Sequence, residues 1–307
     1  MRFNRAGAVG AILLVLAFIA GACGSGGDSN KSSNTTSGKQ KQAITITSAN
    51  FSENEMLGYM YGGVLEKAGY PITYKLKLGA REVIEPALES GQVDFIPEYA
   101  GNYLSYLDKN AGSMEVGKTV DALRTLLRAK NITVLDASEA TDADAIAVTK
   151  DFASKNGLSK LSDLTKVKTP MTLGGPPECA TRSTCKPGLE QTYGIKVDFK
   201  PLDADGPLTR AALDHGDVQL ARVFTADADL KDKGYVVLED DKHFQQAGNV
   251  VPVIRNDKLD DKVKELINKV SAKLTTDKLI DLNKSVQVDK EDPKAAAQKF
   301  LTDNSLI

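Results

Sequence analysis

The stretch ITITSANFSENEMLGYMYGGVLEKA, residues 44–68, decides the fold class. Its first part, Ile44 to Thr47, alternates apolar and polar side chains as a half-buried strand does. Apolar side chains then recur at helical spacing from Met56 to Ala68, and Ser52 with Glu55 predicts a capping box at the start of that helix. A strand that leads directly into a helix indicates a βα unit, the building block of α/β folds.

Strands and helices continue to alternate along the rest of the chain. We expect a strand at Tyr74–Leu78, a helix at Arg81–Ser90 that Pro86 kinks or shifts at its start, and a strand at Val93–Ile96. A second series begins near Ala145. Its expected elements are strands at 171–173, 197–199, 218–223 and 235–238, helices at 188–193 and 207–215, and a helical tail from 259 with a cap at Asp292-Pro293. Two such series predict an α/β protein with two lobes, each a mostly parallel sheet flanked by helices.

Composition and charge exclude several classes of function. The chain has 307 residues and is 41% apolar, which is enough for two folded domains. Lys and Arg total 39 against 41 Asp and Glu, so the basic field that nucleic-acid binding requires is missing. Because His215 and His243 are the two histidines, we expect neither a metal site nor a histidine-driven active site, and no cofactor.

The first 23 residues have the pattern of an export signal. An uncharged run of 15 residues, Ala8 to Ala22, is too short to span a bilayer comfortably. The run ends in LAFIAGAC, which resembles a bacterial lipobox with Cys23 as the lipidated residue; an ordinary cleavage site with Cys23 incidental is the alternative. We expect a signal peptide at 1–22, a lipidated Cys23 with a flexible tether over 23–43, and a protein anchored to the outer face of the bacterial cell membrane.

Two further cysteines, Cys179 and Cys185, lie close together in the chain. In an oxidising, extracytoplasmic setting they can form a disulfide. A thiolate metal site is the alternative, but no histidine lies near them in the sequence. The spacing therefore favours the disulfide.

One segment matches a nucleotide-binding pattern. Residues Gly112–Thr119 fit the phosphate-binding loop G-x-x-x-x-G-K-[ST], which would make the chain a secreted nucleotide-binding enzyme. That loop functions only between a buried strand and a helix, whereas Asn102–Asn110 is typical of a helix or loop. We expect a helix from Lys118 to Leu126 and, since no hydrolase motif is present either, no enzyme activity.

The candidate binding residues follow the ends of expected strands, where open α/β sheets bind ligands. Asn50 and Phe51 precede a helix N-terminus whose amides suit an anionic group. Tyr99 follows a strand and can present a ring face, and Arg182 lies between the two cysteines, where it can pair with a carboxylate. Their equivalent places in the two series predict a cleft shared by both lobes.

Several segments, taken in order, resemble the osmoprotectant-binding lipoproteins of ABC importers, the ProX type that captures glycine betaine, choline or carnitine. The segments that carry this resemblance are ITITSANFSE (44–53), GQVDFIPEYAG (91–101), GGPPE (174–178) with Arg182, PGL (187–189), VLEDDKHF (237–244) and VPV (251–253). The resemblance implies a type II periplasmic-binding-protein fold, with one lobe over 44–144 and 253–307 and the other over 145–252. It also implies a monomer that delivers a solute to a permease and its ATPase subunit.

In such relatives tyrosines cage a quaternary ammonium by cation–π attraction. Here Tyr99 matches, Phe224 keeps a ring, and Asp144, Gly248 and Ala49 replace other residues of the common pattern. The resemblance and the strand ends together give the expected ligand-binding residues Asn50, Phe51, Asn54, Tyr99, Asn102, Asp144, Arg182, Phe224 and Thr225. We expect a small polar or zwitterionic solute such as glycine betaine; a larger aromatic or polyol-like ligand is the alternative.

Overall fold

The computed structural model describes residues 41–204, 206–228, 230 and 232–307. The expected signal peptide, the lipidation site Cys23 and the tether up to residue 40 lie outside the described residues. Residues 41–307 form one compact unit, and no helix in its described part is long and apolar enough to cross a membrane.

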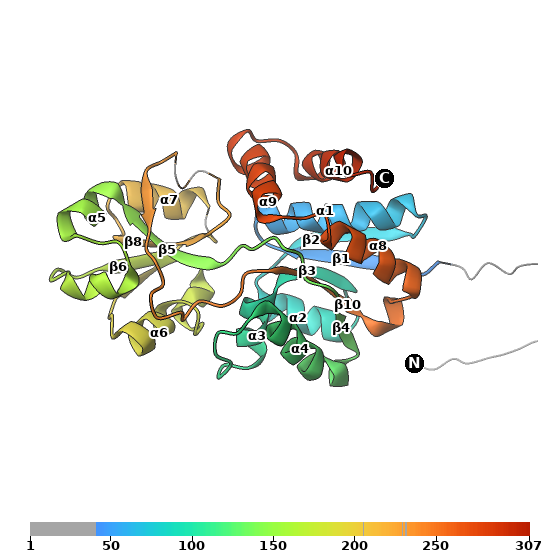
Figure 1. Cartoon of the computed structure of the whole chain (residues 1–307), viewed down its shortest axis with the longest axis horizontal. Helices are drawn as coiled ribbons and strands as arrows, with labels where there is room; N and C mark the ends of the chain where they lie inside the picture. The colour runs from blue at the N-terminus through green and yellow to red at the C-terminus, as the bar shows by residue number, and fades with distance from the viewer. Residues whose placement is uncertain (1–40, 205, 229, 231) are drawn as a thin grey trace, which may run out of the picture. The chain divides into compact units, whose positions relative to one another are not determined.

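Two five-stranded sheets organise this unit, and Figure 1 shows them side by side. The first sheet has the order β2-β1-β3-β10-β4, with β1 Ile44–Ala49, β2 Ile72–Gly79, β3 Phe95–Tyr99, β4 Ile132–Val134 and β10 Val250–Arg255. The second has the order β7-β6-β8-β5-β9, with β5 Asp144–Thr149, β6 Thr172–Gly175, β7 Asp198–Pro201, β8 Leu220–Phe224 and β9 Tyr235–Val237. We call each sheet with its helices a lobe.

The predicted, mostly parallel arrangement is confirmed for both sheets. In each sheet one strand runs against the others: β10 is antiparallel to β3 and β4, and β5 is antiparallel to β8 and β9. These are the strands that the chain enters after crossing from the other lobe. The domain boundaries at 144/145 and 252/253 stay predictions; β5 begins at Asp144 and β10 at Val250.

Helices cover both lobes. On the first lobe they are α1 Ser52–Lys67, α2 Arg81–Glu89, α3 Ala100–Leu107, α4 Val116–Leu127, α8 Asp261–Ser271, α9 Thr276–Asn283 and α10 Pro293–Asp303. On the second they are α5 Lys150–Asn156, α6 Lys186–Gly188 and α7 Pro207–Asp214. Short 3₁₀ or π turns lie at Arg128–Lys130, Leu161–Lys166, Pro177–Ala180, Leu189–Tyr193, Asn256–Lys258 and Lys284–Val288. Asp292 caps α10 as predicted, and α2 begins at Arg81 and continues through Pro86.

The predicted capping box at α1 is wrong. The helix starts one residue earlier than the pattern requires, so Phe51 is the N-cap and makes no side-chain cap. Asn54 instead accepts a hydrogen bond from the Ala49 amide at 2.7 Å and donates to the Pro97 carbonyl at 2.9 Å. Its side chain thereby joins the ends of β1 and β3, which fixes the loop between β1 and α1.

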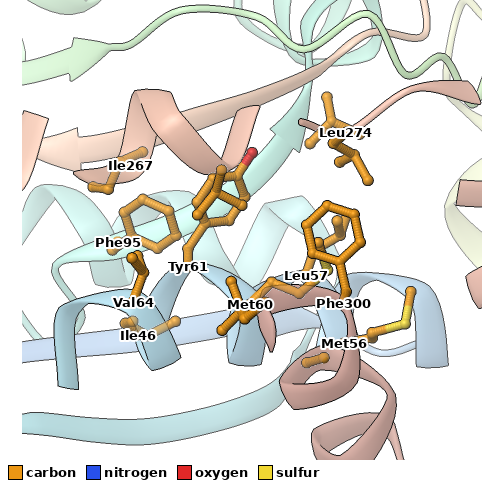
Figure 2. Packing of buried hydrophobic residues seen from close by; sticks show 14 of the residues in the cluster. Ile46, Met56, Leu57, Met60, Tyr61, Val64, Phe95, Ile267, Leu274 and Phe300 are labelled. Carbon is orange, nitrogen blue, oxygen red and sulfur yellow. The ribbon is translucent and has the colours of Figure 1, made fainter. Parts of the chain in front are cut away.

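Apolar side chains fill both faces of the first sheet. Figure 2 shows the cluster in which Met56, Met60 and Val64 of α1 pack with Ile46 of β1 and Phe300 of α10. Alternate residues of a central strand point to opposite faces, so Ile254 of β10 joins this cluster while Val253 joins the cluster beneath α2, α3 and α4. A strand buried on both faces reads as continuously apolar, as β10 does.

Two crossing segments join the lobes and lie against each other: the first is 135–143, between β4 and β5, and the second is 238–249, between β9 and β10. The Asp142 amide donates to the Gly248 carbonyl at 2.8 Å, and Thr141 bridges Asn249. The Gly101 amide at the start of α3 donates to Ala247 at 2.8 Å, and a Cβ at Gly101 would lie 2.6 Å from the Ala247 nitrogen. Glycine is therefore required where α3 meets the second crossing segment.

Candidate functional site

A cavity of about 220 Å³ lies between the two lobes. The first lobe contributes the loop after β1, the end of β3 and the first turns of α2 and α3. The second contributes the loops after β6 and β7, the disulfide loop and the end of β8. These segments mostly follow the carboxyl ends of strands, where α/β sheets bind ligands.

Eight of the nine expected ligand-binding residues line this cavity, namely Asn50, Phe51, Asn54, Tyr99, Asn102, Asp144, Arg182 and Phe224. Thr225 is not among the residues that line it. Its hydroxyl accepts a hydrogen bond from the Ala143 amide at 2.9 Å, and its own amide donates to the Ala143 carbonyl at 2.9 Å. Thr225 therefore fixes the first crossing segment to the end of β8.

Three aromatic rings meet in the cavity. Phe51 and Tyr99 come from the first lobe and Phe224 from the second. The ring centroids of Phe51 and Phe224 are 5.2 Å apart, those of Phe51 and Tyr99 are 6.1 Å apart, and the planes in both pairs differ by 29°. A trimethylammonium group is too wide to enter between Phe51 and Phe224 at this spacing. The rings therefore form a platform rather than opposite walls of a cage.

A buried carboxyl group holds Tyr99 in place. The Tyr99 hydroxyl donates to Glu53 on α1, and the Asn283 amide of α9 donates to the other Glu53 oxygen at 2.5 Å. Burial raises the pKa of Glu53 to about 7, against these hydrogen bonds and with a further contribution from the charge of Asp227. This arrangement could not be predicted from the sequence, because Glu53 occupies an ordinary first-turn position of a helix.

Asp142 brings a second buried acid to the same place. It accepts a hydrogen bond from the Ala226 amide at 2.7 Å and so connects the first crossing segment to the residues after β8. Burial raises the pKa of Asp142 as well, and the nearby Glu53 adds to this rise. The two buried acids, Glu53 and Asp142, thus lie where the lobes are joined.

Asp144 does not stand free in the cavity. It forms an ion pair with Arg222, and the Arg222 Cζ lies 3.8 Å from the centroid of the Phe224 ring. Both side chains are largely buried. Arg222 was not among the expected site residues, because its meeting with Asp144 depends on the register between β5 and β8.

A second buried ion pair was also missed from the sequence. Arg81, the first residue of α2, donates to both carboxylate oxygens of Glu98 on β3 at 2.7 and 2.6 Å. Glu98 further accepts a hydrogen bond from the Tyr99 amide at 3.0 Å. Both residues line the cavity, so this pair forms a rigid, polar part of its wall.

Arg182 reaches across the cavity from one lobe to the other. Its Nη2 and Nε donate to Glu82 on α2 at 2.8 and 3.2 Å, and its Nη1 lies 3.7 Å from Glu178. Burial works to raise the pKa of Glu82, but the hydrogen bond and charge of Arg182 outweigh it and lower that pKa. Arg182 thus joins the lobes at the cavity.

The loop that carries Arg182 is closed by the predicted disulfide between Cys179 and Cys185, whose Cα atoms are 5.2 Å apart. The Cys185 amide donates to the Arg182 carbonyl at 3.1 Å. Disulfide and turn together fix the backbone from which the Arg182 side chain extends.

Two amide side chains remain available to a solute. Among the described contacts, Asn50 and Asn102 form no side-chain hydrogen bond with another residue, and both line the cavity. The Asn54 amide already accepts from Ala49 and donates to Pro97, so Asn54 positions the loop between β1 and α1. Gly248 replaces another residue of the family's common pattern. This replacement does not enlarge the cavity, because a Cβ at Gly248 would lie 2.5 Å from the Ala143 nitrogen.

The segment Gly112–Thr119 does not form a phosphate-binding loop. It lies between α3 and the first turn of α4, so the element directly before it is a helix and not the buried strand that a phosphate-binding loop requires. The hydroxyl of Thr119 donates to the Glu115 carbonyl at 3.1 Å within α4, which itself begins at Val116. The proposed nucleotide-binding enzyme is therefore wrong.

Two α/β lobes, joined by crossing segments around a cavity of rings, amides and ion pairs, define the class of two-lobed solute-binding proteins. The chain belongs to the OpuAC family, the substrate binding domain of ABC-type glycine betaine transport systems, whose sequence profile matches residues 42–303. Members of this family are receptors rather than enzymes, and they supply small solutes to a permease driven by an ATPase.

Individual relatives agree with this assignment. A glycine-betaine-binding protein of Pseudomonas aeruginosa is 26% identical over 87% of this chain and 90% of its own length. An ergothioneine transport permease/ergothioneine binding protein of Helicobacter pylori is 26% identical over 85% of this chain and 48% of its own. The crystal structure of a glycine betaine/carnitine/choline ABC transporter protein has the same fold, with a TM-score of 0.68 at 24% identity over 86% of this chain and 99% of that one.

Proposed function

We propose that the cavity between the lobes captures a small zwitterion of the glycine betaine type. The observation that carries this proposal is that aromatic rings and guanidinium groups line the same cavity from both lobes. A zwitterion presents a cation that ring faces attract and a carboxylate that guanidinium and amide groups bind. The name of the relative in Pseudomonas aeruginosa supports the same class of solute.

Six of the lining residues receive a role in this proposal. Phe51 and Tyr99 offer their ring faces to the cationic group. Asn50, Asn102 and Arg182 donate hydrogen bonds to the carboxylate, the two amides because no other described residue engages them. Asp144 acts through its ion pair with Arg222, which holds that guanidinium at the wall of the cavity.

A second candidate is a larger zwitterion with an aromatic body. The near-parallel Phe51 and Phe224 rings favour it, since a flat group stacks on such a platform more readily than a trimethylammonium does. The ergothioneine-binding relative supports a ligand of this class.

Isothermal titration calorimetry with glycine betaine, carnitine, choline and ergothioneine tests the proposal. We expect glycine betaine or carnitine to bind the full-length protein, and Asn102→Ala and Arg182→Ala each to weaken binding at least about tenfold. Asn110→Ala, an exposed asparagine outside the cavity, is the matched control and should change nothing. Unchanged affinity in both cavity variants would refute these roles, and preference for ergothioneine would favour the second candidate.

The finer localisation is proposed on sequence grounds. We propose that Cys23 is lipidated, that residues 23–43 tether the receptor to the outer face of the membrane, and that it acts as a monomer. The intact mass of the membrane-extracted protein should exceed that of the polypeptide from residue 23 by the mass of the lipid. The bare polypeptide mass, or a water-soluble protein that Cys23→Ala leaves unaltered, would contradict the anchor.

A further inference from the structure

One ring face of the cavity is already covered by a cation of the protein itself. The Arg222 Cζ lies 3.8 Å from the centroid of the Phe224 ring, well within the range of cation–π attraction. The same guanidinium pairs with Asp144 through Nη2. Arg222 therefore already occupies the two groups that would attract a cationic solute, the Phe224 ring and the Asp144 carboxylate.

Three strands hold Arg222 in this position. Asp144 of β5 lies opposite Phe224 of β8, and Arg222, two residues earlier on β8, points to the same face. On β6, a Cβ at Gly175 would lie 3.2 Å from the Arg222 Cβ, so glycine leaves room for the arginine. The Arg222 and Asp144 side chains are only 8% and 6% exposed, which restricts other placements of the guanidinium.

We propose that Arg222 is a specificity-determining residue that makes this cavity select zwitterions over simple cations. This inference rests on the proposed function and names the solute class more closely. A cation without an acidic group gains no hydrogen bond from Arg222, while Arg222 covers the Phe224 ring and pairs with the Asp144 carboxylate that would attract it. The carboxylate of a zwitterion can accept hydrogen bonds from Arg222, since Nη2 alone donates to Asp144 among the described contacts.

The proposal predicts a gain of binding when the arginine is removed. In Arg222→Gln the Phe224 ring is uncovered and the Asp144 carboxylate loses its partner. Both groups then attract a quaternary ammonium. We expect choline, which has a trimethylammonium but no carboxylate, to bind this variant on the order of tenfold more tightly than the wild type. Glycine betaine should not gain, because its carboxylate loses a donor.

Calorimetric titration of the full-length protein in detergent, with choline and with glycine betaine, measures both effects. Arg124→Gln is the matched control, since Arg124 lies on α4 away from the cavity and carries the same charge. This control should bind both solutes as the wild type does. A wild type that binds choline as tightly as Arg222→Gln does would overturn the proposal.

Thermal melting shows whether the unpaired Asp144 destabilises the Arg222→Gln variant. If it does, a double variant provides the test instead. Asp144→Asn with Arg222→Gln removes both buried charges, and choline should still gain affinity through the uncovered ring. Absence of that gain in a folded double variant also contradicts the proposal. If the wild type binds no zwitterion while Arg222→Gln gains choline, the proposed function fails, and of the role of Arg222 only the exclusion of simple cations stands.

Discussion

Tyr99 illustrates how a single contact residue is prepared for its role. Its ring faces the cavity while its hydroxyl donates to the buried Glu53, which Asn283 also contacts. The orientation of the ring therefore depends on a carboxyl group that no solute touches. At this scale the cavity is a set of side chains that other side chains hold in place.

Glu53 should make stability depend on pH. Its pKa in the folded protein is about 7, above its ordinary value of 4.5, so the folded state binds more protons than the unfolded state between these values. The free energy of unfolding should therefore fall as the pH rises from about 5 to about 7 and then level off.

Denaturant titrations of the wild type and Glu53→Gln across this range check the prediction. Glutamine cannot ionise, so the variant should lose stability at pH 5, where a hydrogen bond is weakened, and recover relative to the wild type by pH 8. A difference between the two proteins that stays constant with pH would refute the assignment.

At the scale of elements, the sequence correctly predicted those features of the fold that depend on residues close together in the chain. The β1–α1 junction, the end of β3 and the disulfide loop were found because alternation, helical spacing and close cysteines are local patterns. Their residues do line the cavity. The sequence patterns did not fix where a helix begins to within one residue. The capping box at Ser52 was therefore wrong, because α1 already begins at Ser52.

Contacts that depend on sheet order were out of reach of the sequence. The pair Arg81 and Glu98 requires α2 to lie beside β3, and Arg222 with Asp144 requires the register of β8 on β5. Thr225 was expected in the cavity from the resemblance and the end of its strand, but it bonds to Ala143 instead. Long-range pairing decided each of these cases.

The disulfide loop gives a prediction at this scale. Replacing Cys179 and Cys185 together by alanine should lower the free energy of unfolding by about 2 kcal/mol, because the loop that the bond closes is short. The loosened loop should also weaken solute binding through Arg182. Denaturant unfolding and calorimetry of the double variant measure the two effects. If the double variant unfolds with the same free energy as the wild type, the disulfide does not form in the native protein.

For the whole molecule, the ion pair between Arg182 and Glu82 should favour contact between the lobes. Each carries a substantial exposed fraction, 24% for Arg182 and 45% for Glu82, so salt screens the pair and its contribution is small. Glu82→Gln should weaken solute binding by up to about fivefold at low salt, and the difference from the wild type should shrink at high salt.

Glu265→Gln provides the control for this prediction. Glu265 forms exposed ion pairs with Lys262 and Lys269 on α8 and does not line the cavity. Its replacement removes the same charge without touching the contact between the lobes. Equal effects of the two variants on affinity would show that net charge, not the lobe contact, is responsible.

The central claim is that the cavity between the lobes holds the transported solute. A crystal structure of the protein with the tightest-binding zwitterion tests it most directly. We predict electron density for the solute between the Phe51 and Tyr99 rings and the Asn102 and Arg182 side chains. Density elsewhere, for instance in the open pocket that His243 and Lys118 line, with the cavity between the lobes left without solute, would contradict the account.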